Sequence, residues 1–328
     1  MKGKLKKIRV GVFGAAGFAG QELVQMLIAD QFCEIVFLHS RSNQEKKISG
    51  KILENLGIDE ILARKPDCIF FATPAGVCQK FAKKFLENKI KIIDLGADFR
   101  FFDKEIFEKT YRLKFENPGE NPVFGVPEFF SEKIKKAKLI ANPGCFVISA
   151  LLAAFPIADF FSTAVFDSKT GFSGAGVKKF SEISKKINNN FYPYLISGHR
   201  HEAEIQQFFK KPIFFTPHLL PIFRGICTTA HFFIPKKFEN FDFLKYFQEF
   251  FADKKYIKVQ KNIPEISEIQ NKNSAILGGF ENKNGKLTII SVLDNLKKGA
   301  SSNALQNMHQ MFSLPEKIPE ISLDQIVT

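Results

Sequence analysis

Apolar runs of strand length alternate with helical patterns over the first 144 residues. Runs typical of buried strands occur at 8–13, 34–38, 68–72, 90–95 and 139–141. Helical spacing of apolar residues lies between some of these runs, at 21–29 and 77–86. Strands that alternate with helices predict a parallel sheet with crossover connections, which is a doubly wound α/β arrangement.

The pattern changes after residue 144. One long apolar helix is expected over 145–161. Strand-like runs follow it at 163–169, 213–216, 225–234, 275–280 and 287–293. The last two runs flank Asn284-Gly285, which predicts a hairpin because both residues tolerate the positive φ of a two-residue turn. We therefore expect a second, α+β domain with a mixed or antiparallel sheet.

The two domains are expected to divide the chain near residue 144. The first covers 1–144 and the second 145–299. Helical spacing resumes at 302–312, and the segment 300–328 is expected to pack back onto the first domain.

Composition narrows the possible partners. The 328 residues carry 47 Lys and Arg against 34 Asp and Glu, a formal charge of +13. The lysines are scattered, without finger spacing or a basic arm, so a solvated basic surface is expected and a nucleic-acid partner is not. No apolar run reaches transmembrane length, so no membrane association is expected. Five cysteines without a C-x-x-C pair are typical of a reduced, cytoplasmic protein.

A glycine-rich loop follows the first predicted strand. Three glycines with G-x-x-G-x-x-G spacing occur in the run Gly14, Ala15, Ala16, Gly17, Phe18, Ala19 and Gly20. Glycines there let the backbone approach a pyrophosphate, which rests on the N-terminus of the next helix. The context predicts a Rossmann-type dinucleotide site, although a purely structural turn is the alternative.

The end of the second predicted strand indicates which dinucleotide binds. It carries Ser40, Arg41 and Ser42, whereas Glu34, the candidate acid by spacing, lies at the other end of the strand. Arg41 with two flanking hydroxyls suits a 2′-phosphate, so NADP(H) is predicted. An ordinary exposed arginine is the alternative.

Cys145 is the candidate nucleophile. An apolar strand stops at Asn142-Pro143-Gly144, and a helical pattern starts immediately after it. The thiol is therefore expected at a helix N-terminus, where orphan N–H groups and the helix dipole favour the thiolate.

Three further motifs could serve that cysteine. His199 and His201 stand beside Arg and Glu in one polar run, and either could be its proton partner. H-x-H could also be part of a metal site, but no third ligand is suitably spaced, so no metal is predicted. Arg100 follows a strand as a potential anion clamp. Ser173 and Gly174 lie in a second glycine-rich turn, 171–176, which could hold a phosphate or the nicotinamide, or simply turn the chain.

These motifs together resemble the N-acetyl-gamma-glutamyl-phosphate reductase family of arginine biosynthesis, over essentially the whole length. The motifs that carry the resemblance are 14–20, 40–42, 94–100, 142–145, 173–176, 198–201, 218–221, 224–226 and 294–300. The chain departs from the family at Ala203, where proline is usual, at 301–303, where a small Ala/Gly-rich run is usual, and in a short span between Arg41 and Pro66.

The resemblance implies reduction of an acyl phosphate to an aldehyde by NADPH. Cys145 would form a thioester, and His201 would be the acid and base. Arg100, His199 and Asn142 would contact the substrate, and Asn295 would lie near the nicotinamide. A homodimer or homotetramer built on the second domain's sheet is also implied.

Rival functions stay open at this stage. A related reductase could act on aspartyl phosphate, although its usual cysteine turn differs from Asn-Pro-Gly-Cys. Another could act on a carrier-linked aminoadipyl phosphate, because pocket shape decides acyl length. A non-catalytic, NADP-sensing or nucleic-acid-binding protein is the rival of a different class.

Overall fold

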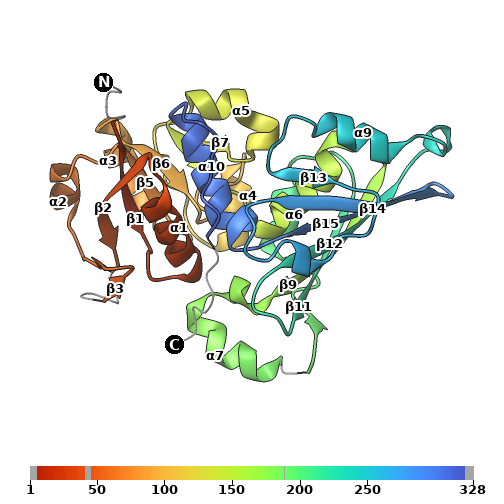
Figure 1. Cartoon of the computed structure of the whole chain (residues 1–328), viewed down its shortest axis with the longest axis horizontal. Helices are drawn as coiled ribbons and strands as arrows, with labels where there is room; N and C mark the ends of the chain where they lie inside the picture. The colour runs from red at the N-terminus through yellow and green to blue at the C-terminus, as the bar shows by residue number, and fades with distance from the viewer. Residues whose placement is uncertain (1–5, 41–45, 188, 322–328) are drawn as a thin grey trace. The chain divides into compact units, whose positions relative to one another are not determined.

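The computed structural model describes residues 6–40, 46–187 and 189–321 (Figure 1). The chain divides into two compact units. The first unit comprises 1–143 with 300–328, and the second comprises 144–299. Arg41 and Ser42, two of the predicted cofactor residues, lie outside the described residues.

A six-stranded parallel sheet forms the first unit, in the order β2-β1-β5-β6-β8-β7. The strands are β1 (Ile8–Phe13), β2 (Cys33–His39), β5 (Cys68–Phe71), β6 (Lys91–Asp94), β7 (Val123–Phe124) and β8 (Leu139–Ala141). A separate ladder pairs β3 (Lys47–Ile48) with β4 (Lys51–Ile52). The strand order reverses between β1 and β5, which is where open α/β sheets bind ligands. This arrangement confirms the predicted Rossmann-type fold.

The helices of the first unit connect these strands, except α10, which follows the second unit in the sequence. They are α1 (Phe18–Ala29), α2 (Ile58–Ala63), α3 (Gln79–Glu87), α4 (Lys104–Tyr111), α5 (Pro127–Lys136) and α10 (Ser302–Met311). α1 begins at Phe18 rather than at residue 21, so the predicted loop 14–20 was too long. Gly17 is its N-cap, and the carbonyl of Gly17 accepts the N–H of Gln21 at 2.8 Å. Apolar Phe18 and Ala19 suit a first turn that packs inwards.

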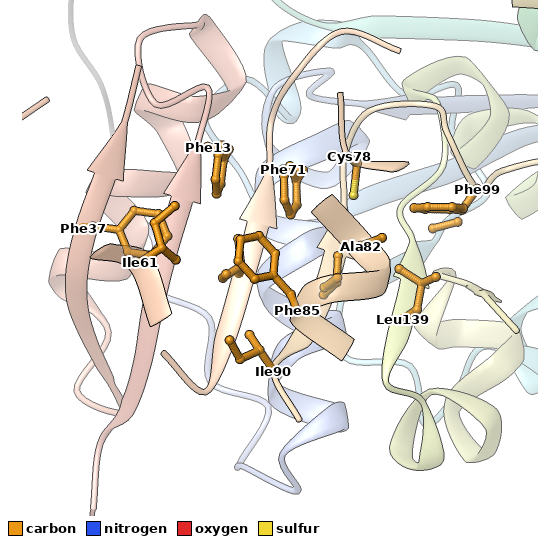
Figure 2. Packing of buried hydrophobic residues seen from close by; sticks show 13 residues of the cluster. Phe13, Phe37, Ile61, Phe71, Cys78, Ala82, Phe85, Ile90, Phe99 and Leu139 are labelled. Atoms are coloured by element: carbon orange, nitrogen blue, oxygen red, sulfur yellow. The ribbon is translucent and has the colours of Figure 1, made fainter. Parts of the chain in front are cut away.

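Phenylalanine rings fill the core of the first unit, as Figure 2 shows. The rings of Phe13 and Phe71 are stacked, with centroids 4.6 Å apart. Phe37 occupies the space beside Gly11, whose Cβ would lie 2.0 Å from Cε1 of that ring. Close packing of this kind fixes the end of β1, from which the glycine turn starts.

A seven-stranded mixed sheet forms the second unit, in the order β10-β11-β9-β12-β15-β14-β13. The strands are β9 (Thr163–Gly171), β10 (Tyr192–Pro193), β11 (Ile213–Leu220), β12 (Ile226–Phe233), β13 (Ile257–Val259), β14 (Ala275–Lys283) and β15 (Lys286–Leu293). β9 pairs parallel with β11 and antiparallel with β12. The predicted hairpin is confirmed, since Asn284 and Gly285 turn between β14 and β15 with φ of 53° and 72°.

The helices of the second unit are α6 (Cys145–Ala154), α7 (Val177–Lys186), α8 (Arg200–Gln206) and α9 (Phe243–Phe250). The helix predicted over 145–161 is shorter, because Pro156 lacks an N–H and its ring clashes with the preceding turn. The chain continues there as a 3-10 turn, η1 (Phe155–Ile157). The remaining short turns of this unit are η2 (Phe172–Ala175), η3 (Lys236–Phe238) and η4 (Ile266–Glu268). The π-helical η5 (Lys297–Ser301) begins in the second unit and ends in the first.

Buried hydroxyls hold α6 on its sheet. Ser149 Oγ donates to Thr228 Oγ1 at 2.9 Å, and Ser291 Oγ lies 3.0 Å from it. All three side chains are fully buried. Hydrogen bonds in such a dry setting specify one arrangement, so the rotation of α6 about its axis is fixed.

None of the helices in the described part of the chain has the length and apolar character needed to cross a membrane.

Candidate active site

Cys145 is the first residue of α6, and Gly144 is its N-cap. Its thiol forms no disulfide and is half-buried. Burial raises the thiol pKa of the four other cysteines, Cys33, Cys68, Cys78 and Cys227. A helix N-terminus favours the thiolate instead, so Cys145 is the cysteine suited to nucleophilic chemistry.

The side chain of His201 lies next to this turn. A Cβ on Gly144 would lie 2.3 Å from Nε2 of His201, so the imidazole fills the space that glycine leaves beside Cys145. His201 is on α8 and is buried. The structure therefore places His201, which the family resemblance implies as the acid and base, beside the glycine that precedes Cys145.

Glu204 is a site residue that the sequence analysis missed. Its carboxylate is fully buried, and Oε1 accepts the N–H of Gly144 at 2.9 Å. Glu204 follows His201 by three positions on α8, so both side chains lie on one helical face. That spacing was the available signal. Its effect is to hold the turn before Cys145 against α8.

His199 orients the start of α8. Its Nδ1 accepts the main-chain N–H of His201 at 3.1 Å, which makes it the N-cap of that helix. Burial, assisted by the charge of Arg200, lowers the pKa of His199 to about 4. The ring is therefore neutral at pH 7, with its remaining proton on Nε2. The predicted substrate contact of His199 stays a prediction.

Tyr194 is a second residue that the sequence analysis passed over. Its ring packs on His199, with centroids 5.8 Å apart. Burial, followed by the proximity of Cys145, raises the pKa of its phenol. A neutral phenol therefore lies in the same cluster as the thiol and the imidazoles.

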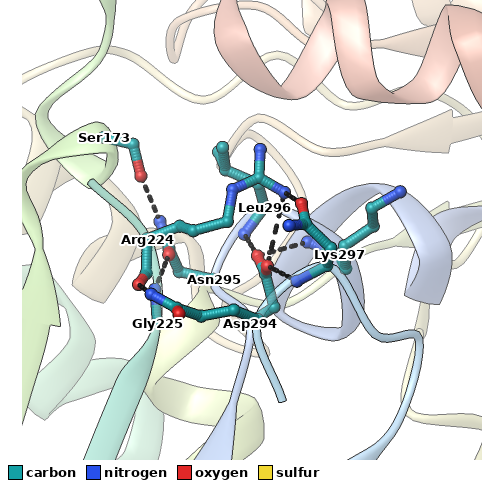
Figure 3. Close-up of polar contacts among 9 residues, drawn as sticks. Ser173, Arg224, Gly225, Asp294, Asn295, Leu296 and Lys297 are labelled. Carbon is teal, nitrogen blue, oxygen red and sulfur yellow. Dashed lines mark hydrogen bonds and ion pairs between the residues drawn. The ribbon is translucent and has the colours of Figure 1, made fainter. Parts of the chain in front are cut away.

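The turn after β15 also packs closely against Cys145. A Cβ on Gly299 would be 2.8 Å from Cβ of Cys145. The turn begins at Asp294 and Asn295, whose contacts Figure 3 shows. Asn295 Oδ1 accepts the N–H of Gly225 at 2.8 Å, and its Nδ2 donates to Ser173 Oγ at 2.9 Å.

Two predicted cofactor residues, Ser173 and Asn295, thus meet through their side chains. Both are buried, whereas Gly174 is exposed. A Cβ on Gly174 would make only ordinary contacts, 3.8 Å from Thr170 Oγ1 and 3.9 Å from Asn295 Nδ2. Their predicted contact with a nicotinamide stays a prediction.

The glycine turn of the first unit lies at the strand-order reversal. Gly14 has φ of +75°, and a Cβ there would lie 2.2 Å from the carbonyl oxygen of Ala72. A Cβ on Gly20 would lie 2.2 Å from the oxygen of Gly14. Gly17 faces open space, with one contact at 3.6 Å. Ala15 is buried, and Ala16 accepts a side-chain hydrogen bond from Gln21 at 2.8 Å.

Ser40 follows β2 in the same unit. It is buried, and its N–H donates to the carbonyl of Glu54 at 2.9 Å. Its position at the carboxyl end of β2 is the usual place for contacts to an adenosine ribose.

Arg100 is buried and committed to the main chain. Its Nε donates to the carbonyl of Asn142, and its Nη2 donates to that of Leu95, both at 2.8 Å. Two buried carboxyls lie nearby, Asp94 and Asp98. Burial and the charge of Asp98, opposed by Arg100, raise the pKa of Asp94 to about 7. The role of Arg100 as an anion clamp stays a prediction.

Asn142 is likewise held within its own unit. Its Oδ1 accepts from Nδ2 of Asn303 at 2.8 Å and from Nδ2 of Asn307 at 3.1 Å. It is 1% exposed, so the predicted substrate contact of Asn142 would need its main chain or a displaced partner.

Within the described residues, no group of three or more His, Cys, Asp or Glu side chains could hold a metal ion.

Two family models match the chain. Residues 9–137 match "Semialdehyde dehydrogenase, NAD binding domain", and residues 145–295 match "Semialdehyde dehydrogenase, dimerisation domain". The chain is 37% identical to the N-acetyl-gamma-glutamyl-phosphate reductase of Methanocaldococcus jannaschii, covering 94% of this chain and 96% of that protein. It is 36% identical to the protein of the same name from Methanosphaera stadtmanae, covering 95% and 97%.

Solved structures of more distant proteins share the fold. Aspartate semialdehyde dehydrogenase II of Vibrio cholerae has a TM-score of 0.74 at 18% identity, covering 94% of this chain and 99% of that one. Aspartate semialdehyde dehydrogenase of Candida albicans, solved with NADP, has a TM-score of 0.68 at 14% identity with the same coverage. At these identities the likeness concerns the fold alone.

Proposed function

Because the chain belongs to the N-acetyl-gamma-glutamyl-phosphate reductase family of semialdehyde dehydrogenases, we propose that it reduces N-acetyl-glutamyl 5-phosphate with NADPH. The products are N-acetyl-glutamate 5-semialdehyde and phosphate. One observation carries the proposal, namely a cysteine at the first residue of α6 with the imidazole of His201 packed on the preceding glycine.

Cys145 is the proposed nucleophile. Its sulfur bonds to the acyl carbon, the acyl–phosphate bond breaks, and phosphate leaves with the electron pair. The resulting thioester keeps the acyl group on Cys145. A thiolate suits both ends of the reaction, because it attacks well and later departs well. N–H groups at the start of α6 are suited to stabilise the oxyanion.

His201 is the proposed acid and base. Its Nε2 takes the thiol proton and later donates a proton to the oxygen of the reduced acyl group. Glu204 holds Gly144 next to this imidazole through its hydrogen bond at 2.9 Å. His199 is less suited to carry the proton, because burial lowers its pKa to about 4.

NADPH, when bound, supplies the hydride that reduces the thioester. The residues of the first unit fit such a dinucleotide, because Gly14 and Gly20 bring main chain together where a Cβ would collide and Gly17 leaves open space. We propose that residues 14–20 hold the pyrophosphate, and that Ser40, Arg41 and Ser42 hold the adenosine ribose with its 2′-phosphate. Ser173, Gly174 and Asn295 of the second unit are the proposed nicotinamide contacts.

The anionic substrate needs positive charge and hydrogen-bond donors. We propose Arg100 as the phosphate or carboxylate partner, with Asn142 and His199 as further substrate contacts. The guanidinium already donates to two carbonyls, so it would act mainly through its charge.

A homodimer or homotetramer is the proposed assembly, built on the sheet of the second unit. The matching family model carries dimerisation in its description. Phe214 on β11 and Phe233 on β12 are 55% and 46% exposed. Both occupy the less buried positions of strands in which buried and more exposed residues alternate. These rings would be covered if a second copy packed on this face of the sheet. Five cysteines, none of them in a disulfide within the described residues, fit a reducing, cytoplasmic location.

The function is tested by the reverse reaction. N-acetylglutamate 5-semialdehyde with NADP⁺ and phosphate should give NADPH, followed by its absorbance, and aspartate semialdehyde should react at least about 100-fold less efficiently. Preference for aspartate semialdehyde, or no reaction with either, would contradict the proposal.

Cys145→Ser should lower kcat by at least about 10⁴-fold, because a hydroxyl at this position remains protonated and nucleophilically weak. NADPH affinity should stay within about twofold. Cys227→Ser is the matched control, since Cys227 is the other half-buried cysteine, and it should keep wild-type kcat. Retained turnover in Cys145→Ser would sink the thioester.

A further inference from the structure

Asp294, in the second unit, is a completely buried charged side chain. Figure 3 shows its polar contacts. Its Oδ2 accepts the N–H of Asn271 at 2.8 Å and pairs with Nη1 of Arg224 at 3.3 Å. Its Oδ1 accepts the N–H groups of Leu296 at 2.8 Å and Lys297 at 3.2 Å. Burying a carboxylate is unfavourable unless hydrogen bonds and an opposite charge compensate it, and here both oxygens are fixed.

Asp294 organises the turn 294–299. Its Oδ1 holds the N–H groups of the second and third residues after it, and its main-chain carbonyl accepts the N–H of Gly299 at 2.9 Å. Side-chain bonds of this Asx type impose a local turn on the backbone. The position of Gly299 therefore depends on that of the Asp294 carboxylate.

Gly299 in turn lies against Cys145. A Cβ on Gly299 would be 2.8 Å from Cβ of Cys145 and 3.2 Å from the carbonyl oxygen of Asp294. The backbone of the turn is thus a wall beside the nucleophilic side chain. A shift of that wall changes the space in which the thiol can rotate.

Asn295 anchors the same turn on its other side. It binds Ser173 Oγ in the glycine-rich turn 171–176 and the N–H of Gly225 after β11. Arg224 and Gly225 therefore receive contacts from Asp294 and Asn295 respectively. Two consecutive side chains thus join three segments of the unit. These contacts hold the turn 294–299 in a fixed position next to Cys145.

We propose that Asp294 is a positioning residue of the reaction. Through the turn 294–299 and Gly299, it holds the thiol of Cys145 in the orientation needed for attack on the acyl carbon. This inference rests on the proposed function in that Cys145 is the nucleophile. Asp294 itself touches no reacting atom, and it acts on geometry rather than on proton transfer.

Three substitutions grade the effect. Asp294→Ala removes all contacts of the carboxylate, Asp294→Asn removes the charge and keeps one acceptor oxygen, and Arg224→Gln leaves the contacts to the turn in place. The readout is the rate at which iodoacetamide alkylates Cys145 between about pH 6 and 9, measured on the Cys145 peptide by mass spectrometry. Burial raises the thiol pKa of the other four cysteines, so they react slowly.

The expected order of effects is Asp294→Ala, then Asp294→Asn, then Arg224→Gln. The alkylation rate of Asp294→Ala at neutral pH should change by at least about threefold, and its kcat should fall by about 10- to 100-fold, a larger factor than the change in KM for NADPH. Asp242→Ala is the control. Asp242 also accepts a main-chain N–H, that of Lys245 at the start of α9, so this variant should lose stability and alkylate like wild type.

A folded Asp294→Ala with a lower melting temperature and wild-type alkylation at every pH would overturn the proposal, because the carboxylate would then be merely structural. If Asp294→Ala does not fold, the other two variants decide. Unchanged alkylation in both would overturn the inference, and a graded change would support it. Alkylation needs neither substrate nor cofactor, so this proposal can fail while the reductase assay succeeds, and the reverse.

Discussion

Glycines make room for different things in the two units. In the first unit, Gly14 and Gly20 let main chain approach main chain, since a Cβ on either would lie 2.2 Å from a carbonyl oxygen. In the second unit, Gly144 and Gly299 make room for side chains, those of His201 and Cys145. The same residue type therefore shapes a close backbone turn in one unit and accommodates the proposed reacting side chains in the other.

Under the proposed function, the glycines of the first unit serve cofactor binding and those of the second unit serve the reaction. A backbone cradle tolerates any sequence that keeps its glycines and its turn, which is why dinucleotide loops are recognised by spacing. By contrast, Gly144 is required only because the imidazole of His201 occupies the space that a Cβ would fill. Substitutions at the two kinds of glycine should consequently fail in different ways.

Gly144→Ala should have the largest effect. The new methyl group would lie 2.3 Å from Nε2 of His201, so the imidazole or the turn before Cys145 must move. Displacements of about 1 Å at a reacting pair cost about 100-fold or more in kcat. NADPH affinity, measured by fluorescence titration, should stay within about twofold.

Gly57→Ala is the control for that variant, because its Cβ would meet only Glu60 Oε2 at 3.4 Å. It should keep wild-type kcat. Equal losses of kcat and NADPH affinity in Gly144→Ala would break the separation between the two units.

Opposite responses to pH should also distinguish the units. Asp94 has a folded pKa of about 7, above its ordinary value, so its stabilising contribution is present at low pH and disappears as pH rises through 7. His199 has a folded pKa of about 4, below its ordinary value, so its contribution is present above about 6.5 and is lost as pH falls towards 4.

Denaturant unfolding at several pH values tests this contrast. From pH 7 to 5, the unfolding free energy of wild type relative to Asp94→Asn should rise, and relative to His199→Asn it should fall, each by about 1 to 2 kcal/mol. Asparagine at position 199 keeps an N-cap acceptor for α8. Changes of the same sign in both comparisons would contradict the assignment.

Gly17→Ala should have the smallest effect. Gly17 has φ of −75°, and its Cβ would meet only the oxygen of Gly14 at 3.6 Å. Unfolding free energy should stay within about 0.5 kcal/mol of wild type. A loss of NADPH affinity of tenfold or more without a loss of stability would sharpen the comparison, since Gly17 would then face the dinucleotide itself.

Local patterns in the sequence were enough to predict the layout of the fold. Apolar runs located the strands that lead to the candidate site residues in both sheets, and Asn284-Gly285 located the hairpin. Both signals could be read because each depends only on residues adjacent in the sequence. Helix ends were less well predicted. The backbone of α1 already turns at Phe18, and Pro156 ends α6 although the apolar pattern continues.

The site was predictable only where chemistry shows in a motif. Cys145 stood out by residue type and setting, and so did His199 and His201 as a pair. The family resemblance chose His201, and the structure places His201 beside the cysteine turn. Glu204 and Asp294 did not stand out, because an isolated acid in a sequence does not reveal burial or a distant partner such as Arg224. Asn142 and Arg100 were read as substrate contacts, and their bonds to the main chain and to α10 depend on tertiary packing.

The first unit is assembled from two stretches of chain that the whole second unit separates in sequence. From the later stretch, α10 supplies Asn303 and Asn307 to Asn142, and His309 to Asp30. During synthesis these partners leave the ribosome after the second unit, which can complete its own sheet first. Until α10 is synthesised, the apolar surface of the amino-terminal stretch stays incompletely covered. We therefore expect chaperones to bind this part of the nascent enzyme.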